Sequence, residues 1–156
     1  KNYMRSTEDE IAFFKKYGGP KFEPYVRDLR YQECLRGSAS KGRLTKTSFV
    51  VCKNPPKGGS QGGLTVGEIT SVIKFNLKFI RACYDQGLKR NPGATGKISV
   101  KFEILNMKVR KVQIMSQTGP LGQTTIKCVN REISDWVFPK QRGKKPVTVN
   151  YPFIFP

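Results

Sequence analysis

The apolar residues between positions 69 and 88 recur every three or four residues, which is the spacing of one face of a helix. Thr65 and Glu68 stand near the start of this stretch, and the Asn-Pro-Gly sequence at 91–93 marks its end. The pattern therefore predicts an amphipathic helix that buries one side.

The following segments alternate between apolar and polar residues, which is typical of strands with one buried face. Residues 97–104 alternate over their whole length, and a shorter alternation follows at 112–114. After the Gly-Pro-Leu-Gly break at 119–122, a second and shorter helical pattern covers 126–136. Residues 147–155 alternate again and predict a closing strand.

The resulting order is helix, strand, strand, helix, strand. Two helices packed on one face of a three-stranded antiparallel sheet are the simplest arrangement that buries all of these apolar stripes. We therefore expect an α+β fold for residues 64–156.

The N-terminal third follows different patterns. Residues 6–17 predict a short helix with capping residues at its start. Two strand-like stretches, 27–35 and 44–53, flank a polar loop and predict a β-hairpin.

These patterns divide the chain into three parts. We expect an N-terminal extension over residues 1–53, a linker rich in proline and glycine over 54–63, and the α+β domain over 64–156. The apolar runs are only a few residues long, so no part of this fragment is expected to span a membrane.

Several spaced motifs in the C-terminal domain resemble one family in the same order. Together they resemble the AgmX/PglI-type branch of the TonB C-terminal-domain superfamily. The motifs are Ile-Arg-Ala-Cys-Tyr at 80–84, Asn-Pro-Gly-Ala-Thr-Gly-Lys-Ile at 91–98, Cys-Val at 128–129, Trp-Val-Phe-Pro at 136–139 and Val-Thr-Val-Asn-Tyr-Pro-Phe at 147–153.

The resemblance implies a non-enzymatic, periplasmic interaction domain at the end of an envelope-spanning machine for transport, gliding motility or secretion. In this superfamily the last strand pairs with a segment of an outer-membrane partner and transmits force from an inner-membrane motor, a form of energy transduction. An inner-membrane anchor would lie upstream of Lys1.

Carried over by position, the partner-binding edge is the strand Val147, Thr148, Val149, Asn150 and Tyr151. Proline at Val149 is expected to abolish partner binding and spare the fold.

The four cysteines allow three pairings. Cys83 and Cys128 lie on the apolar sides of the two predicted helices, and the resemblance includes both positions. Cys34 and Cys52 lie in the two strands of the predicted hairpin. We expect the disulfides Cys83–Cys128 and Cys34–Cys52, as in an oxidising periplasm. A zinc site or reduced, buried thiols are the alternatives.

The charge suggests a second kind of partner. With 29 basic and 11 acidic residues the net charge is +18, which favours an anionic polymer such as peptidoglycan, lipopolysaccharide or nucleic acid. No nucleic-acid-binding motif is present, which disfavours nucleic acid. A solvated basic surface without a ligand is the alternative. The candidate residues are Lys108, Arg110, Lys111, Lys140, Arg142, Lys144 and Lys145.

The sequence disfavours an enzyme. It contains no histidine, the commonest general base, and its glycine-rich stretch at 58–63 lacks the lysine of a phosphate-binding loop. We therefore predict no catalytic residues, no cofactor and no metal site.

Overall fold

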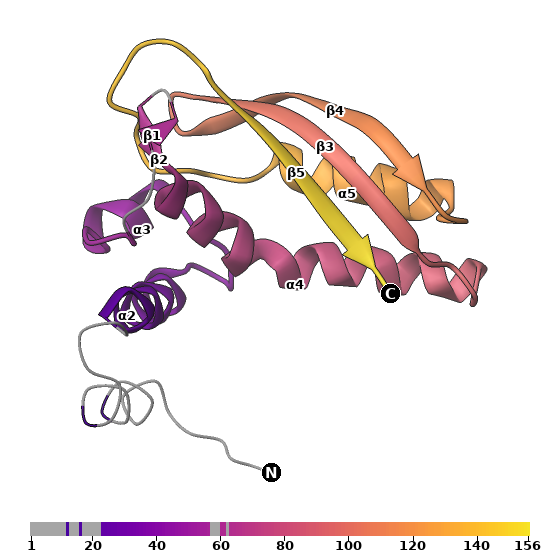
Figure 1. Cartoon of the computed structure of the whole chain (residues 1–156), viewed down its shortest axis with the longest axis horizontal. Helices are drawn as coiled ribbons and strands as arrows, with labels where there is room; N and C mark the ends of the chain where they lie inside the picture. Colours follow the sequence, from indigo (N-terminus) through magenta and orange to yellow (C-terminus); the bar gives the residue numbers. More distant parts are fainter. Residues whose placement is uncertain (1–11, 13–15, 17–22, 57–59, 62) are drawn as a thin grey trace.

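The computed structural model of the chain describes residues 12, 16, 23–56, 60–61 and 63–156. The short helix predicted over residues 6–17 falls almost wholly outside this set. Figure 1 shows a layer of strands lying over two helices, with two further helices at the N-terminal end of the described chain.

The sheet has three antiparallel strands, and β3 (Gly96–Leu105) lies between β4 (Lys108–Thr118) and β5 (Val147–Phe155). Every second residue of β3 is buried, as a strand with one face on the core requires. The buried residues are Ile98, Val100, Phe102 and Ile104. The predicted α+β fold with a three-stranded antiparallel sheet is confirmed.

Helices α4 (Val66–Arg90) and α5 (Gln123–Ser134) lie on the same side of the sheet in Figure 1. A capping box starts α4: Thr65 Oγ1 accepts a hydrogen bond from the Glu68 N–H, and Glu68 Oε1 accepts one from the Thr65 N–H. These two bonds satisfy backbone donors that a helix start leaves without partners.

The two helices approach closely at Gly87. A methyl group on Gly87 would lie 1.8 Å from Thr125 Oγ1, so a glycine here leaves room for α5. One turn earlier in α4, Cys83 is disulfide-bonded to Cys128 of α5, with the two Cα atoms 5.4 Å apart. The bond and the close packing together fix α4 against α5.

The N-terminal segment is helical, so the β-hairpin predicted over 27–35 and 44–53 is wrong. Helices α2 (Glu23–Ser38) and α3 (Lys46–Val51) occupy these stretches. The buried Tyr31 and Leu35 of α2 are four residues apart. Residues four apart lie on one face of a helix, and they also lie on one face of a strand. This spacing therefore left the stretch ambiguous.

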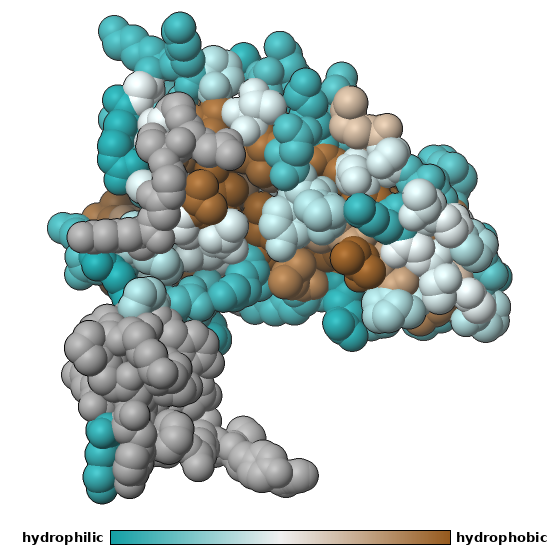
Figure 2. Space-filling model, in the orientation of Figure 1, coloured by the Kyte–Doolittle hydropathy of each residue, from teal (hydrophilic) through white to brown (hydrophobic). Residues whose placement is uncertain are grey.

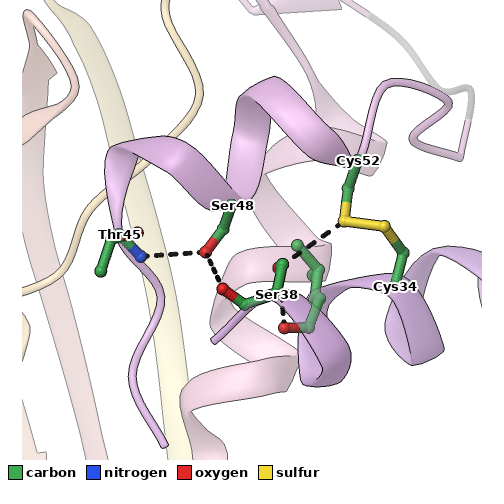
Figure 3. Close-up of a disulfide and its surroundings, with 6 residues drawn as sticks. Cys34, Ser38, Thr45, Ser48 and Cys52 are labelled. Atoms are coloured by element: carbon green, nitrogen blue, oxygen red, sulfur yellow. Dashed lines mark hydrogen bonds between the residues drawn. A yellow bond between two sulfur atoms is a disulfide. The ribbon is translucent and has the colours of Figure 1, made fainter. Parts of the chain in front are cut away.

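Hydrogen bonds and a disulfide hold α3 against α2 (Figure 3). The Thr45 N–H donates to Ser48 Oγ at 3.1 Å, and Ser48 Oγ donates to the Ser38 carbonyl at 3.2 Å. Cys52, which follows α3, is bonded to Cys34 of α2 with Cα atoms 5.8 Å apart. These tertiary contacts outweigh the strand propensity of the Val-Val sequence in α3.

The predicted linker contains secondary structure in its described part. Strand β1 (Ser60–Gln61) pairs with β2 (Leu64–Thr65) in a small antiparallel ladder. Pro56 packs on the start of α4 so closely that a methyl group on Gly67 would lie 1.8 Å from the Pro56 carbonyl oxygen. The described linker residues therefore lie against the protein.

One hydrophobic core joins the N-terminal helices to the sheet. Tyr31, Leu35 and Leu44 belong to the same cluster of buried side chains as the strand residues. The centre of that cluster is aromatic: Trp136 and Phe138 are 3% and 0% exposed and pack around Phe102. The side chains of Trp136 and Phe138 are thus part of the hydrophobic core.

Candidate partner-binding edge and basic surface

Strand β5 forms one edge of the sheet, and Pro152 determines which of its backbone groups face outward. Proline has no N–H, so the pair Ser99–Pro152 in the β3–β5 ladder is of the non-hydrogen-bonded type. The two types of pair alternate along a ladder. Val149 therefore bonds to β3, whereas Thr148 and Asn150 direct their N–H and C=O groups to the open edge.

The side chains of the five predicted edge residues follow the same alternation. Val147 and Val149 are 2% and 6% exposed and pack in the core, and Tyr151 is half-buried. Thr148 and Asn150 are exposed. This strand thus packs into the core with one face while its outer backbone edge stays open to pairing.

The opposite edge of the sheet, β4, is irregular and charged. Its register against β3 shifts twice, and Lys111 adopts a positive φ of 55° at one of these irregularities. Lys108 and Arg110 lie on the same strand. Bulges and basic side chains are the devices by which proteins protect a sheet edge from further pairing. β5 contains no charged residue and its ladder is unbroken, so Pro152 is the one feature that limits pairing at this edge.

A groove of about 370 Å³ runs between β5 and α4 beside this open edge. Leu77, Arg81 and Tyr84 line it from α4, where their spacing places them on one helix face. Leu77 is 39% exposed and Ile154, on the strand side, is 71% exposed. Figure 2 shows hydrophobic surface where β5 crosses α4 in Figure 1. This groove was not predicted from the sequence, in which Leu77, an apolar residue outside the predicted buried stripe of the helix, was the available signal.

Tyr84 ties the end of β5 to α4. Its hydroxyl lies 2.6 Å from the Ala94 carbonyl oxygen and 2.8 Å from the Pro156 carbonyl oxygen, so its proton has two acceptors within reach. Its ring stacks on Phe155 with centroids 4.9 Å apart. One wall of the groove is therefore fixed in place.

The fold brings together the two segments that carry the seven predicted basic residues. A backbone bridge joins Lys108 to Val137, and the Phe138 N–H donates to the Met107 carbonyl at 3.0 Å. The β3–β4 turn thus packs against the loop that precedes β5. All seven side chains are exposed.

Three of these seven residues are ion-paired. Arg110 and Lys111 lie 3.1 Å and 3.8 Å from Glu103 Oε1. Arg142 pairs with the buried Glu68 at 2.9 Å, and this hydrogen bond raises the pKa of Arg142. Within the described part of the chain, no ion pair involves the other four, Lys108, Lys140, Lys144 and Lys145.

The described residues contain no group of three or more His, Cys, Asp or Glu side chains placed to hold a metal ion. Among the helices in the described ranges, none has the length and apolar character needed to cross a membrane.

Comparison with known protein families, with curated proteins and with solved structures found no match.

Proposed function

We propose that this chain is a non-enzymatic protein–protein interaction domain of a TonB-like, envelope-spanning transport, motility or secretion machine. A partner segment adds as a further strand to β5. The observation that carries the proposal is the open edge of β5 before Pro152, where Thr148 and Asn150 present backbone donors and acceptors beside an apolar groove.

The groove contributes specificity in this mechanism. Alternate side chains of an added strand point to the same face as Val149 and Tyr151, which is the face that α4 covers. Such side chains enter the groove against Leu77 and near Arg81. Lys144 and Lys145, which precede β5, favour acidic residues in the partner.

An extracytoplasmic location, the periplasm, is part of the proposal. It is supported by the disulfides Cys34–Cys52 and Cys83–Cys128, because disulfides persist in oxidising compartments. Labelling of free thiols on protein taken from its native compartment tests it. Four free thiols would contradict it.

Four acidic side chains that are held in ion pairs support a role without catalysis. Glu68, Glu103, Glu132 and Asp28 all form ion pairs within the fold. The chain also has no histidine. Carboxylates held in this way serve structure.

Asn150→Pro is the sharpest test of strand addition. The substitution removes an outward-facing N–H and no bond to β3. Pro152 already lacks the outward-facing N–H at its own position, so the fold is expected to tolerate a second proline at 150. The probe is a decapeptide selected from a displayed random library on the full chain. We expect Asn150→Pro to weaken its binding about tenfold, and the bound peptide to slow amide exchange at Thr148, Asn150 and Ile154.

Two variants serve as controls. Asn150→Ala keeps the N–H and is expected to bind the peptide within about twofold of the parent. Val149→Pro removes a bond to β3 and is expected to lose the folded state, which corrects the expectation from sequence that this variant spares the fold. Normal peptide binding by folded Asn150→Pro would refute strand addition.

A second candidate function is binding of an anionic polymer. The observation in its favour is the group of exposed lysines, 108, 140, 144 and 145, at one end of the molecule without ion pairs among the described residues. Binding to peptidoglycan, lipopolysaccharide or DNA would weaken steeply with ionic strength, whereas backbone pairing would not. A salt titration with each polymer separates the two functions.

A further inference from the structure

A second pocket, of about 350 Å³, lies where the N-terminal helices meet the rest of the fold. Helices α2 and α3 form one side of it, and the start of α4, the β3–β4 turn and residues 139–142 form the other. We call it the α2–α3 pocket. It lies outside the β5 edge and shares no lining residue with the groove described above.

The floor of the α2–α3 pocket is apolar. Phe49 and Met107 are half-buried in its lining, and Val50 is 65% exposed. An isolated exposed valine needs no explanation, but here it extends an apolar floor toward the solvent. The floor offers a contact for one or two large apolar side chains.

Tyr31 supplies an unused hydrogen-bond donor to this pocket. Its side chain lines the pocket and is only 4% exposed, and its hydroxyl has no hydrogen-bond partner among the described residues. Burial, with a smaller contribution from the charge of Glu68, raises the pKa of Tyr31 to about 12. The hydroxyl therefore stays protonated and can donate. The hydroxyl oxygen is not among the fully buried atoms that lack a partner, so it is open to water in the pocket and accessible to a ligand acceptor.

The carboxylate in the described lining of the pocket is already engaged. Glu68 lines it, but Glu68 Oε1 accepts from the Thr65 N–H at 2.8 Å and from Arg142 at 2.9 Å, and Oε2 lies 3.4 Å from the same guanidinium. Arg142 and Glu68 thus compensate each other. Lys46, Lys53 and Lys140 remain at the rim, with no ion pair among the described residues.

We propose that the α2–α3 pocket binds an acidic peptide segment that carries a large apolar side chain. The apolar side chain rests on Phe49, Val50 and Met107, and the neighbouring carboxylates face the three lysines. One carboxylate accepts the hydroxyl proton of Tyr31. A peptide fits better than a lipid. The exposure of Val50 shows that the pocket is open to water, and a long acyl chain bound there would keep much of its apolar surface in contact with water.

The test uses the full chain and a dye-labelled probe, acetyl-Glu-Glu-Phe-Glu-Leu-amide. Binding is followed by fluorescence polarisation, and the site is mapped by amide chemical shifts of the isotope-labelled chain. We expect shifts at Tyr31, at residues 49–53 and at Lys140, and none at 148–154. The Gln-Gln-Phe-Gln-Leu and Glu-Glu-Ala-Glu-Ala peptides are expected to bind at least about tenfold more weakly.

Two charge-reversal variants complete the design. The double variant with Lys53→Glu and Lys140→Glu is expected to weaken probe binding about tenfold or more. The matched pair Lys89→Glu and Lys127→Glu makes the same charge change elsewhere, and is expected to act less than about threefold. Tyr31→Phe tests the donor and is expected to weaken binding about threefold to tenfold.

Four results would overturn the proposal. They are shifts at the β5 edge, shifts spread over the whole basic surface, equal weakening by both charge-reversal pairs, and no binding at millimolar probe. Anionic phospholipid vesicles that shift the same amides in place of the probe would overturn the assignment to a peptide. Strand addition at β5 has its own test in Asn150→Pro, and shifts confined to residues 148–154 would count in its favour while overturning the α2–α3 pocket.

Discussion

Gly87 is the residue at which a single added methyl group tests the packing of α4 on α5. Its Cβ would lie 1.8 Å from Thr125 Oγ1, a buried hydroxyl oxygen without a hydrogen-bond partner among the described residues. We expect Gly87→Ala to lower the free energy of unfolding by about 1–3 kcal/mol, measured by urea denaturation.

Gly37 provides the matched control. It also lies in a helix, and a methyl group there would meet no atom within 4 Å. Gly37→Ala is expected to be neutral or to stabilise by up to about 1 kcal/mol. Thr125→Ala is expected to recover part of the loss in Gly87→Ala. Equal effects of the two glycine substitutions would contradict the steric argument.

Tyr31 makes stability depend on pH in the alkaline range. The pKa of Tyr31 is raised from 10.0 to about 12 in the folded chain. Its contribution to the free energy of unfolding is complete below about pH 10. This contribution is lost as the pH rises toward 12, because Tyr31 releases its proton at a lower pH in the unfolded chain than in the folded chain. The stability difference between the parent and Tyr31→Phe should therefore fall between about pH 10 and pH 12, measured by urea denaturation. A difference that is constant with pH would contradict this.

At the scale of elements, Cys83–Cys128 joins α4 to α5, Cys34–Cys52 joins α2 to the residue after α3, and the two bonds close loops of different length. The sequence separations are 18 for Cys34–Cys52 and 45 for Cys83–Cys128. In the chain-entropy model the shorter loop stabilises by about 3 kcal/mol and the longer one by about 4 kcal/mol.

We expect replacement of both cysteines of a pair by alanine to cost about these amounts, measured by chemical denaturation. The larger loss is expected for Cys83→Ala with Cys128→Ala. The reverse order would show that local strain or packing, and not loop length, determines the effect.

The elements of the C-terminal domain could be predicted because burial in them follows a clear period. β3 buries every second residue, and α4 starts at the capping pair Thr65 and Glu68 as the sequence indicates. The resulting three-stranded antiparallel sheet was predictable for the same reason.

The N-terminal helices could not be predicted from local pattern. α3 contains a Thr-Ser-Phe-Val-Val sequence whose propensity favours a strand, and its helical form depends on contacts to Ser38 and Cys34 in α2. Such contacts exist only once the chain is folded. The α2–α3 pocket was unpredictable for the same reason, since its walls come from segments far apart in the sequence.

At the scale of the whole molecule, the net charge of +18 opposes the compact state through self-repulsion. Salt screens this repulsion, and the Debye length falls from about 20 Å to about 6 Å between 20 mM and 300 mM ionic strength. We expect the melting temperature to rise by several degrees over this range.

A variant with lysines 108, 140, 144 and 145 replaced by glutamine carries four fewer positive charges. Its melting temperature should depend less on salt than that of the parent. A melting temperature that falls with sodium chloride in the parent would show that ion pairs such as Arg43–Glu132, at 2.7 Å, outweigh the repulsion.

The two disulfides also lie in separate stretches of the chain, one ending at Cys52 before the other begins at Cys83. During synthesis into an oxidising compartment, Cys34 meets its native partner before either later cysteine has emerged. Cys83 then finds only Cys128 unpaired. In each pair both thiols are oxidised together by an oxidant of that compartment, which takes up the two electrons. The order of emergence then selects one pairing of three, and the native bonds form without reshuffling.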